Sequence, residues 1–256
     1  GGRADVATFQ IQVANTPTGS IQALVTNKLA ATPEGDAALF ARAAGIGAIE
    51  GAVARGENGS AAAVAASAGS VGGTQARTAG GDPFDRAGTA AFSAVRGAVI
   101  GALDNPNLTI SQIEAITKSA VKNAILSFDE TITGRSDSSI AISAAIGVIR
   151  AFNEEGNNDL TKLAAIIRGA TAGSFEGQIV FNPNGNPQDD LEGVQGLNQE
   201  AIRLGLSSTV ISAIASTSVS AAIAAVRTAG VQISAFSDSQ VTADVNFNLA
   251  RGRIRS

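Results

Sequence analysis

A pattern of residues that recurs fifty positions apart constrains the fold of this chain more than any other feature. The stretch 89–127 contains two apolar-periodic segments separated by a polar turn, and the same design returns in 143–172. The equivalent pairs are Gly97 and Gly147, Val99 and Ile149, Ile113 and Leu163, Ile116 and Ile166, and Ala120 and Ala170. A fixed offset through two helices and their turn is the signature of a repeated supersecondary unit. The sequence therefore predicts stacked helical hairpins.

The repeat extends less clearly in both directions. Backwards it reaches a predicted helix over 32–55, which begins with threonine, proline and glutamate. Gly45, Gly47 and Gly51 each cost this helix about 1 kcal/mol relative to alanine. That cost is explained if another helix or strand crosses closely at these glycines. Forwards the repeat reaches an apolar helix over 208–228, whose alanines match the spacing loosely.

Both ends of the chain show the alternation of apolar and polar residues that is typical of a half-buried strand. Near the N-terminus the alternating apolar residues are Phe9, Ile11 and Val13. A turn containing proline and glycine follows, and 20–26 returns as a second strand. Near the C-terminus the alternating residues include Val241, Val245, Phe247 and Leu249, after a first strand over 231–236. Each end is therefore predicted to form a β-hairpin.

These patterns predict an α+β fold that is mainly helical, with one domain over 1–256. The N-terminal hairpin occupies 1–27, the helical repeat body 32–228 with a short strand near 176–181, and the C-terminal hairpin with its basic tail 231–256. The two ends are expected to form one small antiparallel sheet packed on the helices. Alternatively, a terminal strand pairs with a neighbouring subunit, because a free strand edge is a template for strand addition.

Composition excludes several kinds of site. The chain has no Cys and no His, which removes disulfides, Ser–His and Cys–His catalysis and imidazole metal ligands. A net charge of −4 argues against nucleic-acid binding, and no apolar run reaches the roughly 20 residues that a membrane span needs. The absence of Met, even at position 1, leads us to expect that an N-terminal segment is removed, and the lack of oxidisable Met and Cys suits an extracellular or cell-surface protein.

Three weaker patterns suggest chemistry. Ser119 and Lys122 match the S-x-x-K of serine acyl-enzymes, although Ser119 falls inside a predicted helix rather than at its start. The oxygen-rich loops 153–159 and 182–192 resemble weak calcium sites, but the second lacks early acidic residues and the first is more simply a helix cap. We therefore predict no catalytic residues, no metal site and no cofactor.

The function that we predict is a non-enzymatic structural subunit that assembles with copies of itself into a filament, a fimbria-like fibre or a layer. The expected contacts are the apolar residues of the terminal strands and three arginines that would share one strand face, Arg251, Arg253 and Arg255. A surface anchor is a further expected partner. The alternatives are a helical-repeat module that binds a ligand or protein and, less favoured, a serine acyl-enzyme.

Overall fold

The computed structural model describes residues 2–57, 59–62, 64, 67, 83–127, 137–156, 158–181, 190–229 and 237–255, and every element in these ranges is a helix. This described part of the chain is 85% helical. The helices are α1 (Gly2–Ala14), α2 (Thr18–Ala30), α3 (Glu34–Ala54), α5 (Pro83–Asp104), α6 (Ile110–Leu126), α8 (Asp137–Glu154), α9 (Leu160–Phe181), α11 (Gly193–Arg203), α12 (Ser208–Thr228) and α13 (Asp238–Ile254).

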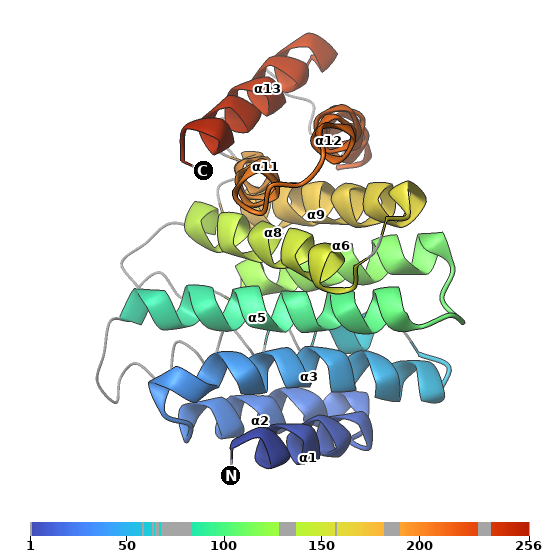
Figure 1. Ribbon diagram of the computed structural model, residues 1–256, viewed down its shortest axis with the longest axis vertical. Helices are drawn as coiled ribbons and strands as arrows, with labels where there is room; N and C mark the ends of the chain where they lie inside the picture. The colour runs from blue at the N-terminus through green and yellow to red at the C-terminus, as the bar shows by residue number, and fades with distance from the viewer. Residues whose placement is uncertain are drawn as a thin grey trace.

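The helices stack in two rows along the long axis of the molecule (Figure 1). In the first row α1, α3, α5, α8, α11 and α13 each contact the next. In the second row α6 contacts α9, and α9 contacts α12. Helix α2 contacts α3 and α1, and it shares one apolar cluster with them and with the described residues 61 and 64. The N-terminal and C-terminal helices therefore lie at opposite ends of the stack (Figure 1).

Glycines set the spacing of the first row. A methyl group on Gly97 of α5 would lie 2.0 Å from the carbonyl oxygen of Arg42 in α3. The same methyl on Gly147 of α8 would lie 2.5 Å from the carbonyl oxygen of Phe92 in α5. In α5, the carbonyl of Phe92 contacts α8 and lies five positions before Gly97, which contacts α3. In α8, the carbonyl of Ile142 contacts α11 and lies five positions before Gly147, which contacts α5. The fifty-residue repeat is thus a repeat of backbone contacts, which explains why glycine recurs.

The contact continues beyond these two helices. A methyl on Gly47 would lie 2.3 Å from the carbonyl oxygen of Gln10, one on Gly196 would lie 2.4 Å from that of Ile142, and one on Gly252 would lie 2.7 Å from that of Gln195. The prediction that another element crosses closely at the α3 glycines is confirmed. Between the helices lies a core of small residues with isoleucine, leucine and valine, and its largest fully buried side chain is Phe175.

The predicted N-terminal hairpin is wrong, because residues 2–14 and 18–30 form α1 and α2. Phe9 and Val13 are buried, but Ile11 is 61% exposed. An alternating pattern contains positions four apart, and these also lie on one face of a helix. The alternation in α1 is therefore compatible with a strand and with a helix. A strand would bury Ile11 together with Phe9 and Val13, whereas the helix leaves Ile11 exposed.

The predicted C-terminal strand and the short strand near 176–181 are also wrong, so the described part of the chain contains no sheet. Residues 176–181 continue α9, and 238–254 form α13. Val241, Val245 and Leu249 are buried four residues apart, while Phe247 is 46% exposed. The first strand of this hairpin, 231–236, lies outside the described residues.

Side chains at the helix starts account for several boundaries. Thr109 and Gln112 form a reciprocal capping box at α6, so Thr109 is the cap of this helix. Asp159 Oδ1 accepts the backbone N–H of Thr161 at 2.8 Å, as the sequence predicted for the start of α9. The backbone N–H groups of Thr161 and Lys162 hold the pKa of Asp159 below its usual value. The acidic turn before α9 is therefore a helix cap.

Candidate functional site

The outward face of α13 carries an apolar stripe beside the exposed polar residues Asn246 and Arg253. Four residues lie on the face opposite the buried one, spaced four, three and four positions apart, as one side of a helix requires. They are Ala243, Phe247, Ala250 and Ile254, all of them exposed. Phe247 is 46% and Ile254 84% exposed. An exposed apolar stripe at this spacing matches the face that a helix normally packs against another helix.

The outward face of α1, at the other end of the stack, also has exposed residues on one side of the helix, but their side chains are smaller. Ala4, Ala7, Thr8 and Ile11 are exposed opposite the buried Phe9. The described part of the chain has five exposed large hydrophobic residues, and three of them, Ile11, Phe247 and Ile254, lie on α1 and α13. Exposed apolar surface is therefore concentrated at the two ends.

The buried face of α13 is unusually polar, and the residue pattern did not predict this. Asp244 is 3% exposed and Asn248 is fully buried. Asn198 of α11 donates its amide Nδ2 to the carbonyl oxygen of Leu249 at 2.7 Å, and Arg251 Nη1 donates to Glu192 Oε1 at 2.7 Å. Polar contacts therefore hold α13 on α11 in addition to its buried valines and leucine.

The three C-terminal arginines do not share one face, because they belong to a helix and its cap. Arg251 bonds to Glu192 of the same chain, and its guanidinium carbon lies 5.7 Å from the Phe247 ring centroid. Arg253 and Arg255 are exposed. An i, i+4 pair shares a helix face, so Arg255 lies on the side of Arg251, and Arg253 points away from both. Of the predicted interface residues, the structure leaves Ile11, Phe247, Arg253 and Arg255 exposed, and it buries Phe9, Val13, Val241, Val245 and Leu249.

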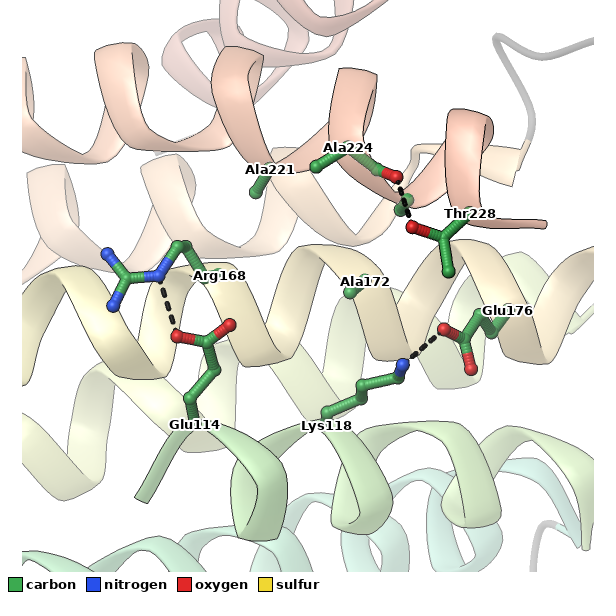
Figure 2. Close-up of a pocket in the computed structure, with 9 residues that line it drawn as sticks. Glu114, Lys118, Arg168, Ala172, Glu176, Ala221, Ala224 and Thr228 are labelled. Atoms are coloured by element: carbon green, nitrogen blue, oxygen red, sulfur yellow. Dashed lines mark hydrogen bonds and ion pairs between the residues drawn. The ribbon is translucent and has the colours of Figure 1, made fainter. Parts of the chain in front are cut away.

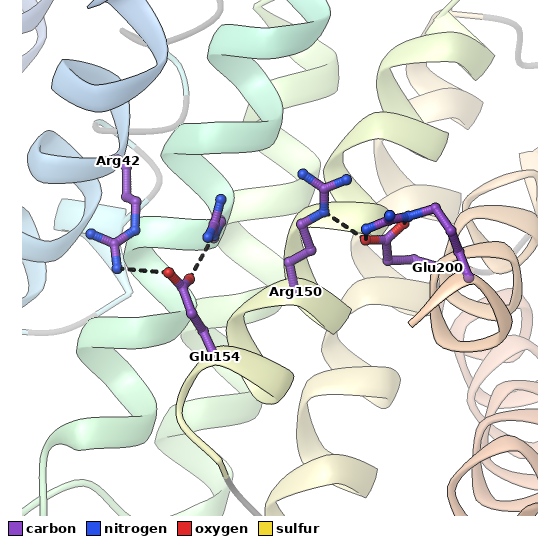
Figure 3. A network of polar contacts seen from close by, with 6 residues as sticks. Arg42, Arg150, Glu154 and Glu200 are labelled. Atoms are coloured by element: carbon purple, nitrogen blue, oxygen red, sulfur yellow. Dashed lines mark hydrogen bonds and ion pairs between the residues drawn. The ribbon is translucent and has the colours of Figure 1, made fainter. Parts of the chain in front are cut away.

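A chain of ion pairs runs along one edge of the first row (Figure 3). Glu154 of α8 accepts hydrogen bonds from Arg96 Nε at 2.7 Å and Arg42 Nη2 at 3.3 Å. Glu200 of α11, whose side chain is 2% exposed, accepts from Arg150 Nε at 2.6 Å and Arg203 Nε at 2.7 Å. Burial raises the pKa of both carboxyl groups, but the arginine hydrogen bonds outweigh it and the net shift is downward. The network joins α3, α5, α8 and α11 side by side.

A shallow hollow of about 170 Å³ lies between α6, α9 and α12 (Figure 2). Its floor consists of small side chains, including Ala172, Ala221 and Ala225. Its rim carries two ion pairs, between Arg168 Nε and Glu114 Oε2 at 2.7 Å and between Lys118 and Glu176. Lys122 also bonds to Glu176, at 3.1 Å. Each of these charged groups has a partner of opposite charge within the chain.

The serine acyl-enzyme pattern falls in the middle of α6. Lys122 Nζ donates to Glu176 Oε2, so it is held against a carboxylate of α9. Ser119 is half-buried and lies beside Gly59. In a helix, residues three apart lie on the same side, and so the match between Ser119 and Lys122 also follows from ordinary helix geometry.

An acidic pair lies at the ends of α5 and α8. The pKa of Glu155 is raised to about 7, mainly by a hydrogen bond with the carboxyl group of Asp104 and secondly by burial. In the part of the chain that the structure describes, no group of three or more acidic residues could hold a metal ion. The predicted loop 182–192 falls largely outside the described residues, since these begin again at residue 190.

Two described helices are long and apolar enough to cross a membrane when judged by length and composition alone, Asp36–Ala54 and Ser208–Thr228. In the stack 67% of the first segment and 33% of the second are buried. A core helix of a folded domain passes the same test. The expectation that no segment spans a membrane remains a prediction.

Comparison with known proteins found no match: no protein-family model, no curated protein and no solved structure matches this chain. Functional arguments therefore rest on the helical stack and its surfaces.

Proposed function

We propose that the protein is a non-enzymatic structural subunit that assembles with copies of itself through the two ends of its helical stack. The proposal includes a secreted or cell-surface location and a filament, fimbria-like fibre or layer as the product. The chain lacks the easily oxidised Met and Cys, which suits such a location. Assembly through terminal helices replaces the assembly through terminal strands that the sequence predicted.

The observation that supports the proposal most strongly is the apolar outward face of α13. In the interior, each first-row helix buries a face of this kind against the next helix, but α13 has no successor within the described chain. Ile254 at 84% and Phe247 at 46% exposure would lose water contact if a further helix packed there. Burying a large apolar side chain contributes about 1.5–3 kcal/mol.

Size measurement on two matched variants tests the proposal. Phe247→Ser and Ile254→Ser together should convert polymers into monomers in light scattering and negative-stain microscopy. The control is Leu160→Ser, because Leu160 has the same 46% exposure as Phe247 but lies on α9, within the stack. The control should assemble like the unmodified chain. Equal assembly by both variants, or a monomeric unmodified chain, would contradict the proposal.

The hollow between α6, α9 and α12 favours a second candidate function, a helical-repeat module that binds a ligand or protein. Its alanine floor leaves room that larger side chains would fill, and charged groups surround it. On this hypothesis the protein is a stable monomer, and Ala225→Leu abolishes ligand binding without changing the helical circular-dichroism signal.

A further inference from the structure

We infer that one edge of the first row binds a doubly charged oxyanion such as sulfate or phosphate, either as the free ion or as the same group on a polysaccharide. This arginine edge consists of Arg42, Arg96, Arg150 and Arg203, which belong to the ion-pair network in Figure 3. The inference goes beyond the proposed function and does not rest on it, because it uses none of the surfaces at the two ends of the stack.

The four arginines recur along the sequence with nearly the period of the helical repeat. They lie 54, 54 and 53 positions apart, so the successive first-row helices α3, α5, α8 and α11 carry one each. Their side chains are 23–46% exposed, which makes them partly desolvated but still within reach of a ligand. The stack therefore brings together four accessible cations that are far apart in sequence.

Two carboxylates balance only half of this positive charge. Glu154 and Glu200 each pair with two of the four arginines, so these six groups carry a net charge of +2. The whole chain carries −4. A third carboxyl group, that of Glu155, lies near Arg42, but a hydrogen bond with Asp104 raises its pKa to about 7, so it is only about half ionised at pH 7. An excess of one sign of charge on partly buried groups attracts ions of the other sign.

The two middle arginines keep hydrogen-bond donors free. Arg96 and Arg150 donate to their glutamates through Nε, at 2.7 Å and 2.6 Å. Within the described ranges, no hydrogen bond engages the two Nη groups of either side chain. Arg42 adds an Nε that is shielded from water and has no partner. Because a guanidinium group binds an oxyanion through two parallel N–H donors, the free Nη groups of Arg96 and Arg150 are suited to hold one.

Phe92 lies beside both of these guanidinium groups. The guanidinium carbon of Arg150 lies 4.8 Å from the centroid of the Phe92 ring, and that of Arg96 lies 5.9 Å from it. Contact with an aromatic ring orders a guanidinium group without using its N–H donors. The two forks are therefore ordered before any ligand arrives, which reduces the entropic cost of binding. We place the anion between Arg96 and Arg150.

Isothermal titration calorimetry on the full-length chain at constant ionic strength tests the site, with sodium sulfate and sodium phosphate as probes. Replacing both Arg96 and Arg150 by lysine keeps the two charges and removes the forked donors. This double variant should bind sulfate at least about tenfold more weakly, which corresponds to the loss of one charge-assisted hydrogen bond at the low end of its range. The matched control is Arg227→Lys, an exposed arginine of α12, and its affinity should be unchanged.

A second measurement needs no variant. Sulfate should slow the modification of Arg96 and Arg150 by phenylglyoxal in the unmodified chain, as followed by mass spectrometry of peptides, and should leave the rate at Arg227 unchanged. Heparin then distinguishes the two sources of the anion. Binding of heparin at least about tenfold tighter than that of free sulfate would identify a group carried on a polysaccharide, because linked groups bind with higher avidity. Binding no tighter than this would identify the free ion.

Three results would overturn the inference. They are the absence of a binding heat with millimolar sulfate and phosphate, equal sulfate affinity in the lysine variant and the unmodified chain, and equal protection of Arg96, Arg150 and Arg227. The second result would show that the edge attracts anions by charge alone, without a built site. None of these measurements depends on polymer formation, so this inference and the proposed function can fail separately.

Discussion

Replacing Gly97 by alanine should destabilise the protein although alanine is the better helix former. The new methyl group would lie 2.0 Å from the carbonyl oxygen of Arg42, and carbon and oxygen essentially never approach within 3.0 Å in this way. Helices α3 and α5 must therefore separate locally by about 1 Å, which forfeits up to about half of each affected contact energy. Overpacking of this kind costs about 3 kcal/mol at the upper end of its range.

The gain in helix propensity, about 1 kcal/mol, offsets part of that loss and leaves a net destabilisation of about 2 kcal/mol. Unfolding entropy is about 2.1 cal/mol/K per residue, so 256 residues give about 0.54 kcal/mol/K and a melting temperature lower by about 4 °C. Circular dichroism at 222 nm measures this shift. The control Gly19→Ala adds its methyl to open space and should melt at or slightly above the unmodified temperature. A melting temperature for Gly97→Ala that is equal to or above that of the unmodified chain would refute the close-contact explanation.

Three further predictions concern polar groups. Glu155→Gln should raise the melting temperature at pH 8 and leave it nearly unchanged at pH 4.5. The reason is that a pKa raised from 4.5 to about 7 makes folded Glu155 hold its proton more tightly, so stability falls as pH rises between these values; no difference between the two pH values would contradict the acidic pair. Glu200→Gln should lower stability by about 2 kcal/mol in urea unfolding, because Arg150 and Arg203 lose charge-assisted hydrogen bonds to a buried carboxylate, and an unchanged midpoint would show that the pairs contribute nothing. Thr109→Ala should cost about 1 kcal/mol in the same assay through loss of the capping box at α6, whereas Ser111→Ala, which removes a residue that is not the cap, should be near neutral.

The helical body was predictable because its apolar residues and glycines follow one period. The offset between Gly97 and Gly147 reflects a physical contact, since each glycine must admit the backbone of the preceding helix. Helix starts were predictable where a capping side chain was present, as at Asp159. At Thr32 the same reasoning failed, because its hydroxyl donates to the carbonyl oxygen of Lys28 in the preceding helix.

The C-terminal end was mispredicted because its buried face is partly polar. In α13 the buried positions 244 and 248 are occupied by aspartate and asparagine, so the apolar residues that remain visible look alternating. In a strand, Val245, Phe247 and Leu249 would lie on one face and be buried together. In the helix, Val245 and Leu249 are buried and Phe247 lies on another side, where it is exposed. The alternative spacing of Ala243, Phe247, Ala250 and Ile254 was present in the sequence, and it was the available sign of an outward helix face. Contacts to distant Asn198 and Glu192 that stabilise α13 have no local sequence signal.

The serial arrangement of the first row has a mechanical consequence. Each of these helices contacts its neighbours along the row, so a pulling force applied between α1 and α13 would pass along the row, with part of it shared by the second row through contacts such as those of α5 with α6 and α8 with α9. Interfaces in series carry the same tension, and the first to yield is the weakest one. The interface between α11 and α13 has the same kind of glycine contact, at Gly252, and adds the polar contacts made by Asn198 and Glu192. Under tension the molecule would therefore lengthen in discrete steps, as one helix–helix interface after another separates, and it would absorb work at each step.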